Sequence, residues 1–538
     1  MRTLPTSYCL QVLVAIGCVL LPVLLQGSYA FIDDGIAYYF LWTVFLTGVW
    51  LRFRWPVWVC MPAVFVAFAY SGYVVSQHED VGYNVTCAAL DSNIGEIVSY
   101  ILIPSVAKSA CVMVVLFGGL CWLLCGKWLG RKVTGNLRLH GAVLPVVMLG
   151  CAAAYAMTGS GWNKQQMYPA DVVTQGFRFI RDVKSAISRY TKVNYTYAGP
   201  AAAQGPPRLT AVLVIGESAR AASWSLYGYG RDTNPEVAAW MAKSKGRGVV
   251  FSDALSAGRL TMNSVPSMLS PTTAENFRDY CSKPSLIRVF RAAGFRTAIL
   301  SSHLSVSRFW DGPGNLMMNA AAEFKRIDGD VQQPAALNDW RTHEAMPRQL
   351  AVLHLFGSHY DYGDRYPANF KLFHGSNEMV DTYDNSLAFT DHVLGGIIAE
   401  IEDMSDPAVM FYSSDHGENL NDFGDGNIQH SCREFTRYEI EVPMIFYANQ
   451  AFADAYPRQL AAIRACENLP VSHDNISQTL LGLAGLTDPQ VHLPEYDLST
   501  APYTPPPRFL INSLRDSLAE AVIRATPHGR HVNLNGEQ

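Results

Sequence analysis

Long apolar runs with almost no charge occupy the first 160 residues of the chain. A helix needs about 17–25 mostly apolar residues to cross roughly 30 Å of hydrocarbon. Five runs reach or approach that length: 8–31, 36–51, 56–75, 106–124 and 141–157. The first run alone also fits a signal peptide, but four further runs favour a membrane domain. We therefore predict an α-helical membrane anchor of five transmembrane helices over residues 1–160.

Apolar runs of a different kind begin near residue 208. Three of them are short, almost wholly apolar and followed by acids or histidines: 209–216, 349–354 and 408–414. Such runs are typical of buried parallel strands whose carboxyl ends carry function. Helical patterns over 285–293 and 385–402 lie between them. The pattern predicts an α/β sandwich over residues 208–538, joined to the anchor by a basic surface segment and a Gly/Pro-rich linker over 161–207.

The distribution of charge divides the chain in the same way. Only 16% of the 538 residues are charged, against about 25% in typical soluble domains. Residues 1–160 hold eight Lys and Arg and six Asp and Glu, so the shortage lies in the predicted anchor. This excludes a wholly soluble enzyme, a many-helix transporter and a basic protein with a nucleic-acid partner.

Basic residues in the links between the predicted spans give the orientation. Arg52 and Arg54 follow the second span, and four Lys and Arg lie over 127–138 after the fourth, whereas the opposite links are acidic. Because Lys and Arg favour the cytoplasmic side, we expect a cytoplasmic N-terminus. Five spans then place the large domain on the far side of the membrane.

Polar residues at the ends of the predicted strands are the candidate chemistry. Singly, each has an ordinary explanation: Glu217 can cap a helix, His354 can pack in the core, and His430 can lie on the surface. Together, Glu217, His354 and the pair Asp415-His416 bring metal-ligand types to three strand ends. A catalytic zinc uses such ligands and keeps one position open. The sequence therefore predicts a zinc site, although Mn²⁺ accepts a similar ligand set.

Several motifs in order carry a family resemblance. They are Gly-Glu-Ser-Ala-Arg at 216–220, Gly-Tyr-Gly-Arg-Asp-Thr-Asn-Pro at 228–235, Thr-Met-Asn-Ser-Val-Pro at 261–266, His-Leu-Phe-Gly-Ser-His at 354–359, Arg-Tyr-Pro at 365–367, Tyr-Asp-Asn-Ser at 383–386, Ser-Asp-His-Gly-Glu at 414–418 and Ser-His-Asp-Asn at 472–475. With five spans before them, they resemble the phosphoethanolamine transferases, inner-membrane enzymes of the alkaline phosphatase/sulfatase superfamily. The resemblance covers nearly the whole chain and implies a sulfatase/alkaline phosphatase-like sandwich.

The resemblance also implies roles for residues. It makes Thr261 the nucleophile and places Glu217, Thr261, Asp415 and His416 around one tightly bound zinc. His359 and His430 match histidines that contact the transferred phosphate or a second metal, and His354 supports the site from behind.

Candidate substrate contacts follow from the same resemblance. Arg308 lies where relatives place head-group contacts, and its guanidinium can grip a phosphate with two hydrogen bonds. Ser92 and Glu96, in an outer loop of the anchor, resemble a pair that faces the donor lipid, and one helical turn separates them. A solvated loop explains that pair equally well. Asp384, Asn385, His473 and Asp474 more simply brace the strand-end loops.

The chain departs from the lipid A-modifying members around the nucleophile. Ala257 and Ser267 stand where those members have cysteines, and Arg259 replaces a threonine. Packing is therefore expected to hold this loop, and core sugars or periplasmic glucans become more plausible acceptors than lipid A. Only Cys281, Cys432 and Cys466 belong to the large domain, which limits it to one internal disulfide.

The implied function is transfer of phosphoethanolamine from phosphatidylethanolamine to a cell-envelope acceptor, through a phosphoethanolamine ester on Thr261 and with release of diacylglycerol. The expected protein is a monomer in a bacterial inner membrane with a periplasmic catalytic domain. A sulfatase is disfavoured, since Ser264-Val-Pro-Ser lacks the arginine of a formylglycine site. A glycerophosphate transferase of the lipoteichoic acid synthase type and a non-enzymatic membrane scaffold remain as alternatives.

Overall fold

The structure is a computed structural model, and it describes residues 170–199, 206–303, 313–344, 346–424, 428–430, 436–513 and 516–519. The five predicted spans, Ser92, Glu96, Arg308 and Cys432 lie outside the described residues. Within the described ranges, none of the helices combines the length and the apolar character that crossing a bilayer requires.

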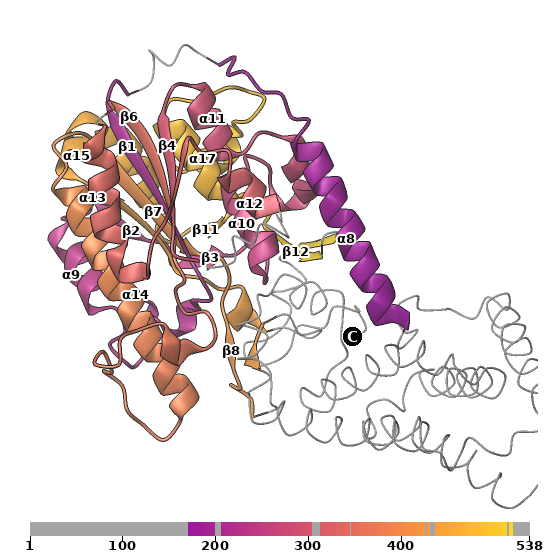
Figure 1. Cartoon of the computed structure of the whole chain (residues 1–538). Coiled ribbons are helices and arrows are strands. Elements are labelled where there is room, and N and C mark those ends of the chain that lie inside the picture. The colour runs from indigo at the N-terminus through magenta and orange to yellow at the C-terminus, as the bar shows by residue number, and fades with distance from the viewer. Residues whose placement is uncertain are drawn as a thin grey trace, which may run out of the picture. The chain divides into compact units, whose positions relative to one another are not determined.

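A seven-stranded sheet forms the centre of the large domain (Figure 1). Its strands are β1 (Leu209–Gly216), β2 (Gly248–Val250), β4 (Arg296–Ser301), β5 (Glu323–Arg326), β6 (Arg348–His354), β7 (Ala408–Ser414) and β10 (Met444–Ala448), in the spatial order β2-β10-β7-β1-β6-β4-β5. Strands β7, β1, β6, β4 and β5 are parallel, and β10 runs antiparallel to both β7 and β2. The parallel strands therefore deliver their carboxyl ends to one edge of the sheet.

Three short strand pairs lie outside the main sheet. They are β3 (Asp253–Leu255) with β11 (Pro470–Ser472), β8 (Asn419–Leu420) with β9 (Ile428–Gln429), and β12 (Phe509–Ser513) with β13 (Asp516–Ala519). The first pair lies beside the loop before Thr261, and the second directly follows the Asp415-His416 segment.

Helices cover both faces of the sheet. They are α8 (Ala170–Tyr190), α9 (Pro235–Lys243), α10 (Thr261–Leu269), α11 (Leu286–Ala292), α12 (Pro313–Met318), α13 (Gln333–His343), α14 (Glu378–Glu402), α15 (Gln450–Ala455), α16 (Pro457–Ala465) and α17 (Asp474–Leu483). Figure 1 shows α9, α13 and α14 on one side of the sheet and α10, α11, α12 and α17 on the other. The α/β sandwich that the sequence predicts is confirmed.

Alternation along β1 explains why two faces are buried. Leu213 and Ile215 belong to the hydrophobic cluster on the α10 side, whereas Val212 and Val214 belong to the cluster on the α14 side. Because successive side chains of a strand point to opposite faces, a strand covered on both sides must be apolar at every position. All eight residues of β1 are buried.

The helices and strands predicted from the sequence agree closely with those of the structure, with two differences. Helix α14 begins at Glu378 rather than near 385, where the Asn377 side chain caps it by accepting from Val380 N. The segment expected at the surface before the linker contains α8, and a compact unit of the chain begins within it at Ile180. Val183, Ala186 and Tyr190 of α8 are buried, so the end of this helix is part of the core.

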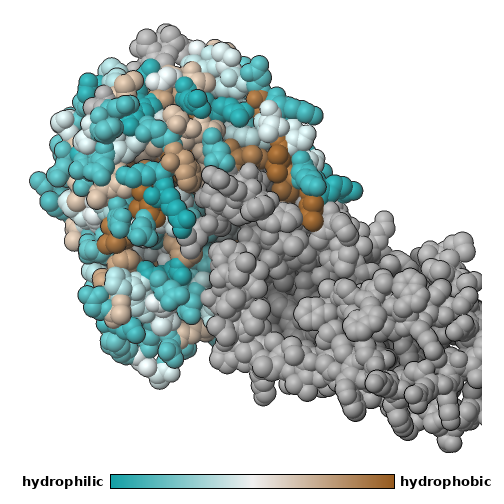
Figure 2. Space-filling view, viewed as in Figure 1, coloured by the Kyte–Doolittle hydropathy of each residue, from teal (hydrophilic) through white to brown (hydrophobic). Residues whose placement is uncertain are grey.

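The face of the described residues in Figure 2 is mostly hydrophilic, with hydrophobic side chains in small separate groups. Cys281 and Cys466 are buried and free, and no disulfide joins them.

Candidate active site

Two acids leave neighbouring parallel strands side by side. Gly216 of β1 pairs with Ser414 of β7, and Glu217 and Asp415 follow them. The backbone of Asp415 continues the ladder, since its N–H donates to Gly216 O at 3.0 Å. Both side chains are buried, with exposed fractions of 1% and 0%. Two carboxylates are thus fixed close together by regular sheet geometry.

The turn after β1 is built around Glu217. Ser218 adopts the left-handed region with φ 56°, its N–H donates to Asp415 Oδ1 at 3.1 Å, and its hydroxyl donates to Glu217 Oε1 at 2.9 Å. Gly357, with φ 51°, approaches from β6, and a Cβ there would lie 2.8 Å from Glu217 O. Backbone strain of this kind is common where a side chain must be aimed.

Thr261 lies above the acids as the first residue of α10. Its Oγ1 is 3.4 Å from each carboxylate oxygen of Glu217 and 3.4 Å from Nε2 of His416. The hydroxyl is therefore within contact of two potential metal ligands.

The electrostatics of the cluster favour a cation. Nδ1 of His416 bonds the Gly417 carbonyl at 2.9 Å, so Nδ1 carries hydrogen and Nε2 faces Glu217 and Asp415, at 3.4 Å from each. Burial opposes a charge on this imidazole, but Asp415 and Glu217 raise its pKa to about 10. Burial and the neighbouring Glu217 raise the pKa of Asp415 well above its usual value.

The donor set fits a divalent metal. One ligand atom each from Glu217, Asp415 and His416 lies within 4.8 Å of the others. Oδ2 of Asp415 is buried and makes no hydrogen bond within the described part of the chain. Two buried carboxylates and an imidazole nitrogen are ligand types that zinc accepts, and a divalent ion would satisfy charges that are otherwise buried at a cost.

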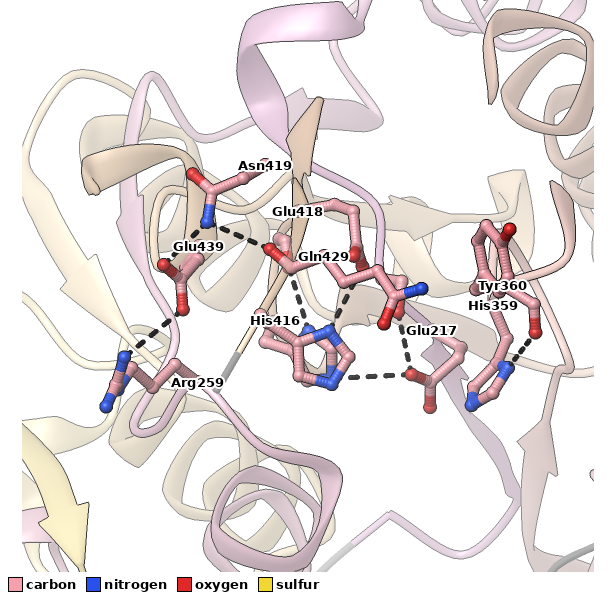
Figure 3. A network of polar contacts seen from close by, with 12 residues as sticks. Glu217, Arg259, His359, Tyr360, His416, Glu418, Asn419, Gln429 and Glu439 are labelled. Atoms are coloured by element: carbon pink, nitrogen blue, oxygen red, sulfur yellow. Dashed lines mark hydrogen bonds and ion pairs between the residues drawn. The ribbon is translucent and has the colours of Figure 1, made fainter. Parts of the chain in front are cut away.

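A second group of ligand types adjoins the first (Figure 3). His430 Nδ1 lies 3.2 Å from Glu418 Oε2, and the His430 and His416 rings are 3.9 Å apart. His416, Glu418 and His430 also place ligand atoms within 4.8 Å of one another. Burial raises the pKa of Glu418 to about 8. On the other side, His359 Nδ1 contacts the Tyr360 carbonyl at 2.6 Å.

Two further histidines stack behind Glu217. The rings of His303 and His354 lie 4.9 Å apart, and His303 Nε2 is 3.7 Å from Glu217 Oε2. Burial lowers the pKa of His354 to about 4, so it is neutral at physiological pH. Within the described residues, His354 does not belong to either group of metal-ligand types.

Comparison with known proteins places this geometry in a family. A sequence model of the sulfatase family matches residues 210–486, just over half of the chain. The chain belongs to the sulfatase family.

This sulfatase-family chain is also similar to phosphoethanolamine transferases, which confirms the resemblance that its motifs predict. It is 27% identical over 277 residues to phosphoethanolamine transferase EptC of Escherichia coli K12, covering 47% of each chain. It is 29% identical over 265 residues to phosphoethanolamine transferase EptA of Helicobacter pylori, covering 46% of this chain and 49% of the relative. The chain thus aligns with about half the length of these curated relatives.

Solved structures share the fold. The integral membrane lipooligosaccharide phosphoethanolamine transferase A of Neisseria meningitidis has a TM-score of 0.68 at 20% identity, covering 91% of this chain and 98% of that one. The C-terminal periplasmic domain of EptC from Escherichia coli, in complex with Zn, has a TM-score of 0.54 at 22% identity, covering 61% of this chain and 96% of that one. These TM-scores show a common fold.

The structure brings together most of the residues that the sequence singles out. Glu217, Thr261, Asp415 and His416 form one cluster, with His430 against it. Two residues near them, Glu418 and His303, are not among the ligands that the resemblance implies. The sequence places Glu418 only within the motif at 414–418, although its position after Asp415-His416 was a usable signal. His303 lies two residues after the end of β4, where the resemblance places head-group or phosphate contacts.

The side chains of His473 and Asp474, at the start of α17, brace the segments on either side of α10. The Ala257 N–H donates to Nδ1 of His473 at 3.2 Å, so Nε2 carries the hydrogen and bonds the Ser414 carbonyl at 2.9 Å. Asp474 accepts from Ala274 N at 2.9 Å. The loop is held by polar contacts as well as by packing: Arg259, 1% exposed, forms an ion pair with buried Glu439 at 3.4 Å. Buried polar contacts therefore add to the packing that was expected to hold this loop.

Proposed function

We propose that the protein transfers phosphoethanolamine from phosphatidylethanolamine to an acceptor of the cell envelope, with Thr261 as the nucleophile. One observation carries the proposal. The Thr261 hydroxyl is 3.4 Å from Glu217 and His416, inside a buried cluster whose donors fit a divalent metal. Similarity to named phosphoethanolamine transferases supplies the substrate class.

Glu217, Asp415 and His416, with Thr261, would hold the metal, for which zinc is our candidate. When bound, zinc would lower the pKa of a nearby hydroxyl and offset negative charge on a phosphate. A solved relative with this fold was crystallised in complex with Zn, which supports the choice of metal for this chain. A second ion at His416, Glu418 and His430, or a phosphate bound by His359 and His430, is compatible with the same geometry.

The protein's own groups account for a two-step transfer. In the first step, Thr261 Oγ1 bonds the phosphorus of the donor and the bond from phosphorus to the glycerol oxygen breaks. The glycerol oxygen gains a proton, which balances the proton that Thr261 loses, and diacylglycerol departs. In the second step the oxygen of an acceptor hydroxyl bonds the phosphorus, the bond from phosphorus to Thr261 Oγ1 breaks, and the proton that the acceptor loses balances the one that Thr261 regains. Covalent catalysis of this kind divides one difficult transfer into two easier ones.

We further propose that residues 1–160 anchor the protein in a bacterial inner membrane through five spans, with the N-terminus in the cytoplasm. Residues 161–207 would bridge to a periplasmic catalytic domain over 208–538. A lipid donor would then meet the site beside the bilayer, and Arg308, Ser92 and Glu96 are the proposed contacts to it. The protein would act as a monomer on a core-sugar, lipid A or glucan acceptor.

Mass spectrometry of the purified full-length protein tests the proposal. After incubation with zinc and phosphatidylethanolamine, the Thr261 peptide of the wild type should gain one phosphoethanolamine group. Thr261→Ala should carry none, whereas Thr261→Ser keeps a hydroxyl and should retain some adduct. Thr382→Ala, at a half-buried position of α14, is the matched control and should behave as wild type.

The mass of the adduct separates the alternatives. A phosphoglycerol adduct formed from phosphatidylglycerol would indicate a glycerophosphate transferase. A protein that retains zinc but forms neither adduct would support the scaffold and refute the proposed transfer.

A further inference from the structure

A buried polar chain connects the nucleophile loop to the hairpin that carries His430 (Figure 3). Arg259, two residues before Thr261, donates from Nη1 toward Oε2 of Glu439 at 3.4 Å. The other carboxylate oxygen, Oε1, accepts from Asn419 Nδ2 at 2.7 Å. That same Nδ2 donates to the carbonyl of Gln429 at 2.9 Å, and Gln429 precedes His430.

The three side chains that form this series of hydrogen bonds are buried away from water. Arg259, Glu439 and Asn419 have exposed fractions of 1%, 0% and 1%. Asn419 lies on β8 directly opposite Gln429 of β9, so its side chain fixes both strands of the pair. The Glu439 carboxylate thus has one oxygen toward the nucleophile loop and one toward the β8–β9 pair.

The backbone around Glu439 holds the same two regions. The Glu439 carbonyl accepts from Gly417 N at 2.7 Å, and the Ile440 carbonyl accepts from Ser256 N at 2.8 Å. Gly417 follows His416, and a Cβ at Gly417 would lie 2.0 Å from the Tyr438 carbonyl. Segment 437–440 is therefore closely packed between His416 and the loop that leads to Thr261.

We propose that Arg259 and Glu439 are positioning residues that couple the placement of Thr261 to that of His430 and His416. The inference rests on the proposed function, because it assigns these residues an effect on the transfer by Thr261. Charged hydrogen bonds in a dry interior have narrow distance and angle requirements. A displacement of Glu439 would therefore shift both the loop before Thr261 and the β8–β9 pair. Misplacing a reacting group by about 1 Å can cost roughly 100-fold in rate.

In this proposal, the Arg259–Glu439 ion pair holds the nucleophile loop in place of a disulfide. Ala257 and Ser267, where the motif resemblance implies cysteines in the lipid A-modifying members, are both fully buried here. An ion pair from Arg259 to Glu439 anchors the loop from within two residues of its nucleophile. Unlike a disulfide confined to the loop, this tie reaches the neighbouring hairpin.

Kinetics of adduct formation on the zinc-loaded, full-length protein provide the first test. Arg259→Met and Glu439→Gln should each lower the rate at saturating phosphatidylethanolamine by about 10–100-fold, with KM changed less than about threefold. Arg259→Lys, which keeps the charge, should recover at least about fivefold over Arg259→Met, although lysine lacks the planar fork of arginine. The control is Arg247→Met, which breaks the part-buried Arg247–Glu402 ion pair elsewhere in the domain.

Hydrogen exchange gives a second readout that does not depend on activity. Glu439→Gln should speed amide exchange both in the segment 257–260 and in β8, whereas Arg247→Met should change neither. Faster exchange in only one of the two segments would overturn the coupling. So would a rate loss in Arg259→Met no larger than in Arg247→Met at an equal loss of thermal stability. If the wild type forms no adduct at all, the proposed transfer fails, and the exchange data still decide whether the two regions are coupled.

Discussion

The candidate site combines two groups of residues that the fold holds in different ways. Glu217, Asp415 and His416, the strand-end group, directly follow paired parallel strands and are almost wholly buried. Thr261, His359 and His430, the loop group, come from a helix start and two loops, and the His430 side chain retains 19% exposure. Backbone ladders fix the first group, whereas side-chain contacts and turns fix the second.

The difference separates two tasks. Buried acids that cannot move are suited to holding a cation, because a bound cation offsets the repulsion between their carboxylates. Residues on loops can meet a substrate and leave room for its exchange. We therefore expect changes to the strand-end group to remove the metal, and changes to His359 or His430 of the loop group to slow the reaction while the metal is retained.

The largest effect is expected from Asp415→Asn. Loss of one of two buried carboxylates should lower zinc affinity by more than the roughly 10–100-fold that outer positions cost, and the Thr261 adduct should disappear. The measurement is the amount of zinc that Asp415→Asn and wild type each retain in the presence of a chelator, together with adduct formation by each protein. Unchanged zinc affinity would show that the metal is not held by the strand-end group.

A smaller effect is expected from His430→Gln. Its imidazole contacts Glu418 and the His416 ring, so its loss should reduce adduct formation or turnover by about 10–100-fold with zinc largely retained. His359→Gln, across the site, offers a parallel measurement. Loss of metal in either variant would erase the distinction between the two groups.

A backbone change at Gly357 should act on the strand-end group alone. In Gly357→Ala, left-handed strain of about 1–3 kcal/mol adds to a contact of 2.8 Å between the new Cβ and Glu217 O. We expect a lower unfolding temperature and weaker zinc binding. Gly424→Ala is the matched control, since Gly424 also has a positive φ, of 70°, but its Cβ would meet nothing within 4 Å. Equal zinc affinity in the two variants would contradict the prediction.

Asp391 should affect stability without affecting the site. On α14, its carboxylate accepts from Glu236 N and Val237 N at the start of α9, and burial raises its pKa to about 7. An acid with a raised pKa binds its proton more tightly when folded, so its contribution to stability is complete below about pH 4 and falls as pH rises to about 7. The free energy of unfolding of Asp391→Asn, plotted against pH, should not show this decrease.

Unfolding of wild type and Asp391→Asn between pH 4 and 7 measures the effect. The difference between their free energies of unfolding should change by up to about 4 kcal/mol across that range, at about 1.4 kcal/mol per pKa unit. Adduct formation near neutral pH should be unchanged. Parallel stability curves would show that this carboxyl does not titrate as its burial implies.

The sequence was informative where chemistry follows regular structure. Glu217 and Asp415 end apolar runs, and a sheet brings such ends together by rule. The contact of His303 with Glu217 and the role of Glu418 were harder to predict, because a side chain beyond a strand end can turn either into the site or away from it. The Arg259–Glu439 pair joins residues 180 positions apart, and in one sequence no pattern links them. Long-range pairing of this kind follows from the folded loops and not from local periodicity.

His473 has a consequence for how the site responds to acid. Burial lowers its pKa to about 3, and it bridges Ala257 and Ser414 as a neutral ring. An uncharged bridge keeps both of its hydrogen bonds while the surrounding medium shifts from neutral to about pH 4. The spacing between the loop that carries Thr261 and the strand that precedes Asp415 is thereby insulated from acidification. We therefore expect a loss of activity over that range to originate in groups other than His473.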